Sequence, residues 1–169
     1  MTYTGQTQVG SAPAERDLGT LQLTKLAVGQ LDNNVYVLRA PGGETLLVDA
    51  AAESQRIFSV LADGGIDAVV TTHCHHDHWG ALADIVSASG ATTYASRADA
   101  PAIPVATDIT VTDGDTITLG ETELEVILLR GHTPGGLALH FRDAAGGHHL
   151  ITGDSLFPGG IGRTTLETF

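Results

Sequence analysis

Residues 72–78 read Thr-His-Cys-His-His-Asp-His and follow, after Thr71, the short and wholly apolar run Ala68-Val69-Val70. Such a run is typical of a strand that is buried on both faces. Packing does not explain four histidines and one aspartate so close together, because protonated imidazoles repel one another. Imidazole and carboxylate ligands together suit zinc, iron, manganese or nickel. The run therefore predicts metal ligands, which we assign to His73, His75, Asp77 and His78.

Two further clusters of polar residues follow predicted strands. One contains His132 and comes after residues 124–129, and the other contains Asp154 and comes after residues 150–152. Loops at strand ends, held by a rigid sheet, are where binding sites are usually built. We therefore expect His132 and Asp154 to join the first cluster, which would provide enough ligands for two ions.

The rest of the chain alternates between strand-like and helix-like patterns. Apolar spacing predicts helices over residues 53–61 and 81–89, and turn residues at 41–43 predict a hairpin. Strands are predicted over residues 21–28, 35–38, 45–48, 68–70, 92–95, 109–111, 116–119, 124–129, 137–141 and 150–152. Helices lie between strands in the first half, whereas hairpins dominate the second. This order favours two mixed sheets packed face to face with helices outside.

Length and composition indicate one ordinary globular domain. The chain has 169 residues, of which 42% are hydrophobic. Residues 1–17 show no periodicity. We therefore expect a flexible N-terminal tail over residues 1–17, followed by a single domain over residues 18–169.

The charge balance argues against several classes of partner. A formal net charge of -12 and a pI near 4.8 disfavour nucleic acids and anionic membranes, because both attract clustered lysine and arginine. No apolar run is long enough to span a membrane, and residues 1–17 do not have the pattern of a signal peptide. Cys74 is the single cysteine, so no internal disulfide can form. We expect a cytoplasmic protein with a small-molecule substrate.

Three segments together resemble the signature of the metallo-β-lactamase superfamily: residues 72–78, 131–135 and 153–157. The resemblance runs from about Leu21 to Phe169. It implies an α/β (α+β) fold, a four-layer αββα sandwich of two mixed sheets.

The resemblance also implies a division of the ligands between two metal sites. The first site would use His73, His75 and His132. The second site would use Asp77, His78 and Asp154, with Asp154 bridging the two ions. Cys74 and His76 match non-ligand positions of the signature, so we expect Cys74 to pack and His76 to lie behind the ligands or on the surface.

The chain departs from the superfamily in one respect. The superfamily usually supplies a further histidine to the second metal from a later strand, and this chain ends at Phe169 before such a strand. His140, His148 and His149 do not match the expected context. We therefore expect about three-quarters of the usual domain, lacking its C-terminal part, and completion by a homo-oligomer or a complementing C-terminal fragment.

Residues 159–164 are similar to segments of the hydroxyacylglutathione hydrolases (glyoxalase II) and the persulfide dioxygenases, which act on thiol conjugates. The resemblance implies a metal-dependent hydrolase that uses a metal-bound hydroxide on a thioester or related ester. Asp77 would be its catalytic residue, and its metal would be one or two zinc ions, with iron or manganese as alternatives. Arg163 either pairs with a substrate carboxylate or lies solvated in a glycine-rich surface loop.

Two alternative functions stay open. One is a mononuclear iron oxygenase of the persulfide dioxygenase type, whose ligands map to His73, His132 and Asp154. The other is a truncated metal-binding domain without turnover. Metal content distinguishes the oxygenase from the hydrolase, and background activity with metal bound indicates the domain without turnover.

Overall fold

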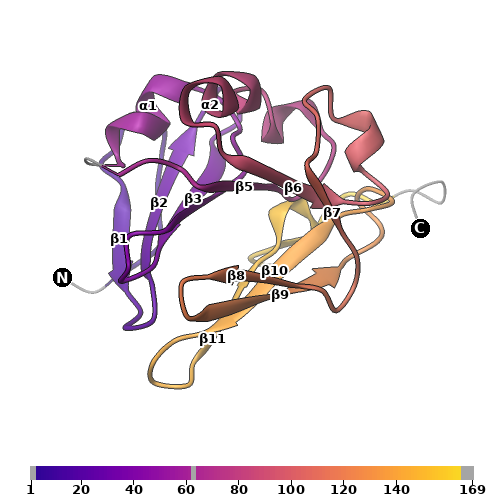
Figure 1. Cartoon of the computed structure of the whole chain (residues 1–169). Helices are drawn as coiled ribbons and strands as arrows, with labels where there is room; N and C mark the ends of the chain where they lie inside the picture. Colours follow the sequence, from indigo (N-terminus) through magenta and orange to yellow (C-terminus); the bar gives the residue numbers. More distant parts are fainter. Residues whose placement is uncertain (1–2, 62–63, 165–169) are drawn as a thin grey trace.

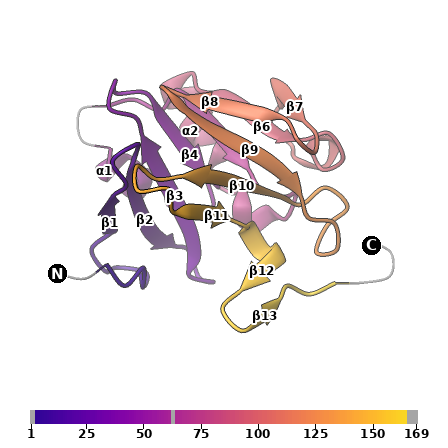
Figure 2. The same cartoon turned by 90° about the horizontal axis from the view of Figure 1, so that it is seen from below.

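The computed structural model describes residues 3–61 and 64–164, which form two sheets packed face to face. Figure 1 shows the two sheets below a layer of helices, and Figure 2 shows the second sheet from below. Residues 1–2 of the predicted tail, and residues 62–63 and 165–169 of the predicted domain, lie outside the described residues.

The first sheet is mixed and has the order β1-β2-β3-β4-β5-β6-β7. The strands from β1 to β4 pair antiparallel, and those from β4 to β7 pair parallel. Their bounds are β1 Ala14–Asp17, β2 Gln22–Val28, β3 Asn33–Arg39, β4 Thr45–Val48, β5 Ala68–Thr71, β6 Thr92–Ser96 and β7 Ile109–Val111.

Two α-helices make two of the three parallel connections of this sheet, and the third, from β6 to β7, contains only the 3-10 helix η2 (Ala100–Ala102). Helix α1 (Ser54–Ser59) joins β4 to β5, and helix α2 (Leu82–Ser89) joins β5 to β6. Parallel neighbours need such crossovers, and both helices cover the same face of the sheet (Figure 1). Among the described residues, no helix has the length and hydropathy of a membrane span.

The second sheet has the order β11-β10-β9-β8 and is wholly antiparallel. Its strands are β8 Thr116–Leu119, β9 Thr122–Leu128, β10 Leu137–Arg142 and β11 His148–Ile151. Each strand pairs antiparallel with the next strand along the chain, so no parallel crossover is needed. The mixed order that we expected in both sheets therefore occurs only in the first. A small pair, β12 (Leu156–Phe157) and β13 (Gly160–Ile161), follows β11.

The core has two parts, one on each face of the first sheet. Successive side chains of a strand point to opposite faces. In β4, Leu46 and Val48 enter the cluster between the sheets, whereas Leu47 packs against the helices. Both faces are therefore buried, as the wholly apolar runs indicated. The architecture confirms the predicted fold class of packed sheets with outer helices.

The last four residues of the predicted flexible tail form a strand in the structure. Ala14–Asp17 form β1, which pairs antiparallel with β2 from Ala14 opposite Lys25 to Asp17 opposite Gln22. The strand is mostly exposed. Main-chain hydrogen bonds at a sheet edge require no apolar alternation, so the sequence pattern did not reveal this strand.

Candidate metal centre

Three loops that are far apart in the sequence meet beside the two sheets. The first follows β5 and carries the three-residue 3-10 helix η1 (His76–His78), the second joins β9 to β10, and the third carries η3 (Gly153–Ser155). They bring together two groups of potential metal ligands. Within each group, the nitrogen and oxygen atoms that could bind a metal all lie within 4.8 Å of one another. The groups are His73, His75 and His132, and His73, His78 and Asp154. The convergence expected from the sequence is therefore observed for these five residues, and their role as metal ligands stays a prediction.

His73 lies at the centre of this arrangement. Its ring centroid is 4.0 Å from that of His78 and 4.8 Å from those of His75 and His132. Its Nε2 atom is buried and has no hydrogen-bond partner among the described residues. Buried polar atoms are nearly always paired, so an unpaired imidazole nitrogen among three other imidazoles fits a metal ligand.

The hydrogen bonds of Asp49 orient two of the imidazoles. Its carboxylate accepts from the main-chain N–H of Thr72 (2.7 Å), the Thr72 hydroxyl (2.7 Å) and Nδ1 of His78 (2.8 Å). Because the Thr72 hydroxyl donates to Asp49, its oxygen accepts from Nδ1 of His73 (3.1 Å). Both histidines are thus held through Nδ1, which directs their Nε2 atoms toward the centre, where they could bind a metal.

Asp49 was missed by the sequence analysis. It follows the fully buried strand β4, is 3% exposed itself and has a positive φ of 61°. A carboxylate directly after a wholly apolar strand is a signal that could have identified it, because a buried charge must be paired.

His132 is oriented in the same way by a different partner. Its Nδ1 donates to the main-chain carbonyl of Arg163 (2.9 Å), and its Nε2 lies 2.9 Å from Nδ1 of His75. Arg163 therefore contacts the centre through its main chain. The Arg163 residue is exposed. The pairing of its side chain with a substrate carboxylate stays a prediction.

Asp77 lies beside the centre and belongs to neither group of potential ligands. Its Oδ2 accepts from the side-chain amide of Asn33 (2.9 Å) and is 3.8 Å from Nε2 of His78. Burial would raise the pKa of Asp77, but the Asn33 hydrogen bond and the nearby His78 bring the pKa below its ordinary value. Its role as a ligand stays a prediction.

The electrostatics of the centre favour a cation. Burial, and then the neighbouring His78, lower the pKa of His73 to about 4, so His73 is neutral at pH 7. Burial would also lower the pKa of His78, but Asp49 and Asp154 outweigh it and raise the pKa to about 10. The same carboxylates would stabilise a bound divalent ion.

Cys74 and His76, the other two members of the run, belong to neither ligand group. Burial and the nearby Asp99 raise the pKa of the Cys74 thiol to about 11, so it stays protonated at neutral pH. The exposed ring of His76 contacts Trp79 edge to face at 4.7 Å. These positions agree with the packing and surface roles expected from the sequence.

The later histidines form separate contacts on the second sheet. His140 lies between Glu125 (2.9 Å) and His148 (2.8 Å), and His149 pairs with Asp143 (2.9 Å). None of the three belongs to either group of potential ligands.

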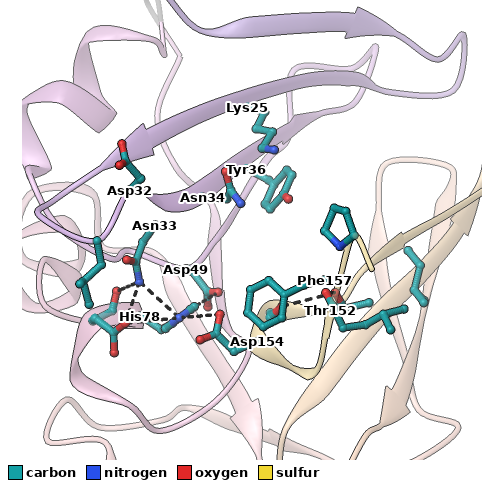
Figure 3. A pocket seen from close by; sticks show the side chains of 16 residues that line it. Lys25, Asp32, Asn33, Asn34, Tyr36, Asp49, His78, Thr152, Asp154 and Phe157 are labelled. Atoms are coloured by element: carbon teal, nitrogen blue, oxygen red, sulfur yellow. Dashed lines mark hydrogen bonds and ion pairs between the residues drawn. The ribbon is translucent and has the colours of Figure 1, made fainter. Parts of the chain in front are cut away.

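A cleft of about 440 Å³ opens beside the centre between β2, β3 and the loop after β11. Figure 3 shows His78, Asp154 and Asn33 in one part of this cleft, with Tyr36 and Lys25 further along it. Burial lowers the pKa of Lys25 and, with help from Tyr3 and Asp49, raises the pKa of Tyr36 to about 12. Phe157 and other apolar residues complete the lining.

Comparisons with known proteins agree on one family. The family model of the metallo-beta-lactamase superfamily matches residues 28–169. A hydroxyacylglutathione hydrolase of Gloeobacter violaceus is 41% identical over 135 residues, which cover 78% of this chain and 52% of that protein. One from Rhodospirillum rubrum is 32% identical, covering 86% of this chain and 56% of that protein. The chain thus spans about half the length of these relatives.

Solved structures show the same fold. The di-iron-bound form of TTHA1623 superposes with a TM-score of 0.70 at 27% identity, covering 84% of this chain and 77% of that one. The B3 metallo-beta-lactamase BLEG-1 has a TM-score of 0.73 at 24% identity, covering 86% of this chain and 78% of that one.

Proposed function

Because the chain belongs to the metallo-beta-lactamase superfamily, we propose that it is a divalent-metal-dependent hydrolase of a thioester, or a related ester, of a small thiol. The observation that supports this proposal most is the unpaired, buried Nε2 of His73 inside two groups of ligand atoms. Such a centre suits hydrolysis without a nucleophilic side chain.

The substrate class rests on the curated relatives. They are named for hydrolysis of a hydroxyacyl conjugate of glutathione. The family match over residues 28–169 includes the three ligand loops, but the chain spans about half the length of these relatives. The thiol carrier and the acyl group are accordingly part of the proposal.

The geometry of Asp154 supports a centre for two ions. Its Oδ1 lies 3.3 Å from Nε2 of His78, and its Oδ2 lies 3.7 Å from Nε2 of His132. One carboxylate oxygen therefore faces each group. His73, His75 and His132 would hold one ion, His78 and Asp77 the other, and Asp154 both. Zinc is the proposed metal, with iron or manganese as alternatives, and bound ions would acidify a water and polarise the substrate carbonyl.

Asp77 would act on the attacking water. The side-chain amide of Asn33 donates to Oδ2 of Asp77 and to its main-chain carbonyl (2.8 Å), which fixes the carboxylate in the lining of the cleft. An oriented carboxylate can accept a hydrogen bond from the water and receive its proton.

Replacement of Asp77 tests this role. Asp77→Ala should lower turnover by a factor on the order of 100 or more, while the midpoint of thermal unfolding changes little, because the side chain is partly exposed. The matched control is Asp84→Ala, which removes an exposed carboxylate from α2. Full activity in Asp77→Ala would remove the two-metal hydrolase from consideration.

Metal content and a substrate panel test the function itself. The purified chain is analysed by mass spectrometry for metals and assayed with esters, thioesters and persulfides. About two zinc ions with thioester cleavage support the proposal. One iron with oxygen uptake on a persulfide would indicate the oxygenase instead, and bound metal without any turnover would indicate a metal-binding domain.

A further inference from the structure

Asp99 lies between two of the ligand loops without contacting a ligand side chain. It follows β6 and is 2% exposed. Its Oδ2 accepts from the main-chain N–H of Cys74 (3.0 Å) and from the hydroxyl of Thr133 (2.6 Å). Cys74 separates the ligands His73 and His75, and Thr133 directly follows His132. One carboxylate oxygen therefore ties the two loops that form the first group of ligands.

The surroundings of Asp99 are built for this contact. Its main-chain N–H donates to the hydroxyl of Ser96 (3.1 Å). A Cβ on Gly135 would lie 2.7 Å from Oδ1 and 2.8 Å from the main-chain nitrogen of Asp99, and would collide with the Ser96 hydroxyl. The loop of His132 can approach Asp99 so closely only because residue 135 is glycine.

The peptide of Cys74 is held on its other side as well. Its carbonyl accepts from the indole Nε1 of Trp79 (2.8 Å). The main chain between His73 and His75 is thus fixed by Asp99 through its N–H and by Trp79 through its carbonyl. Such constraints determine where both imidazoles point.

We propose that Asp99 is a positioning residue that sets the separation between the His73–His75 pair and His132, and thereby the affinity of the centre for a divalent ion. The inference rests on the proposed function only in requiring that the centre bind metal. A short hydrogen bond to a buried carboxylate is strong and directional, which suits a fixed distance between two loops. Removal of the carboxylate would leave two buried donors unpaired and free the loops to move apart.

The test uses the full chain with zinc and with cobalt as a spectroscopic probe. Zinc affinity is measured by competition with a chelator, cobalt coordination by visible absorption, and the stability of the metal-free chain by urea denaturation. The variants are Asp99→Ala, Asp99→Asn and Thr133→Val. Asp108→Ala is the matched control, because Asp108 also accepts one main-chain N–H and one threonine hydroxyl, both from Thr93 (2.9 Å each), away from the ligand loops.

Asp99→Ala should weaken zinc binding at least about 10-fold and alter the cobalt spectrum. Asp99→Asn should restore both, since a single amide oxygen can accept both hydrogen bonds. Thr133→Val, which removes one donor and preserves side-chain shape, should cause a smaller loss. Asp108→Ala should leave affinity and spectrum unchanged even where it lowers stability.

Equal zinc affinity in Asp99→Ala and Asp108→Ala would overturn the inference. If Asp99→Ala does not fold, an unchanged spectrum and affinity in Thr133→Val would overturn it. A wild-type chain that takes up no divalent ion would overturn the metal centre itself, and the two failures are therefore distinguishable.

Discussion

At the scale of single residues, the centre depends on side chains that fix imidazoles as much as on the imidazoles themselves. Asp49 holds His78 directly and His73 through Thr72. The positive φ of Asp49, 61°, is a conformation that aspartate and asparagine tolerate better than most residues. The turn after β4 thus has both a conformational and an electrostatic reason for an aspartate.

Loss of the Asp49 carboxylate should destabilise the metal-free chain strongly. Asp49→Ala leaves three buried donors unpaired, and we expect its free energy of unfolding to fall by about 3 kcal/mol or more. The measurement is urea denaturation with a chelator present. Asp67→Ala, at the other end of β4, removes a single hydrogen bond to Thr45 (2.8 Å) from an exposed carboxylate and should cost only about 1 kcal/mol. Similar losses in the two variants would contradict this account.

Two histidines of the same run provide a matched pair for metal binding. His73 has its unpaired Nε2 in both ligand groups, whereas His76 is exposed and contacts Trp79. We expect His73→Ala to lower bound metal well below the wild-type stoichiometry and His76→Ala to leave it unchanged. Mass spectrometry after extensive dialysis measures both, and equal metal content in the two variants would refute the assignment of His73.

At the scale of elements, the β10–β11 hairpin determines where Asp154 lies, because η3 follows β11 directly. The hairpin turn is closed by Asp143. Its Oδ1 accepts from the main-chain N–H of Ala145 (2.9 Å) and Gly147 (2.7 Å), and its Oδ2 contacts Nε2 of His149 (2.9 Å). A turn on the second sheet therefore supports the position of Asp154, a proposed metal ligand.

The Asp143 turn should make stability depend on pH. The His149 hydrogen bond, and next the Gly147 N–H, lower the pKa of Asp143. A carboxyl group whose pKa is lower in the folded state than in the unfolded state stabilises the folded protein. This contribution is complete at pH values above the unfolded pKa of about 4, and it is lost as the pH falls through the folded pKa. Asp143→Asn should therefore unfold more easily than wild type at pH 7, and the difference should shrink below pH ~4.

Thermal unfolding at a series of pH values measures this difference. His149→Ala removes the largest cause of the lowered pKa, so its melting temperature should depend less on acid pH than that of wild type. A difference between Asp143→Asn and wild type that is the same at pH 7 and pH 3 would exclude a contribution from the charge of Asp143.

At the scale of the whole molecule, the second sheet has an exposed edge. Among the described residues, β11 pairs only with β10, and Figure 2 shows β12 and β13 extending beyond it. Several large apolar side chains on and after β11 are about half exposed or more: Leu150, Leu156, Phe157 and Ile161. Unpaired edges and apolar patches favour association.

We therefore predict that the isolated chain associates in solution. Light scattering after size exclusion should give a mass above the 17.5 kDa of one chain, rising with concentration. Leu150→Lys places a charge on β11 and should reduce association, whereas Ile109→Lys on β7, the edge of the first sheet, should not. A monomer at all concentrations would contradict this prediction and the expected completion by another chain or fragment.

The sequence by itself determined which candidate ligands converge and the order of most elements. The convergence of His73, His75, His78, His132 and Asp154 could be predicted because metal binding demands particular donors, and each lies in a loop after a strand with a clear apolar pattern. The spacing of apolar residues along a strand or helix depends only on neighbouring positions in the sequence. Most helices and strands could therefore also be predicted correctly.

Only the tertiary structure decided how the ligands are held. Asp49 contacts His78, Asp99 contacts Thr133, and the carbonyl of Arg163 contacts His132, across 29, 34 and 31 residues of chain. No local pattern encodes such pairs, because they depend on which strand ends become neighbours once the sheets have formed. For the same reason β1 was missed: its stability comes from main-chain pairing with β2, which any sequence without proline can make.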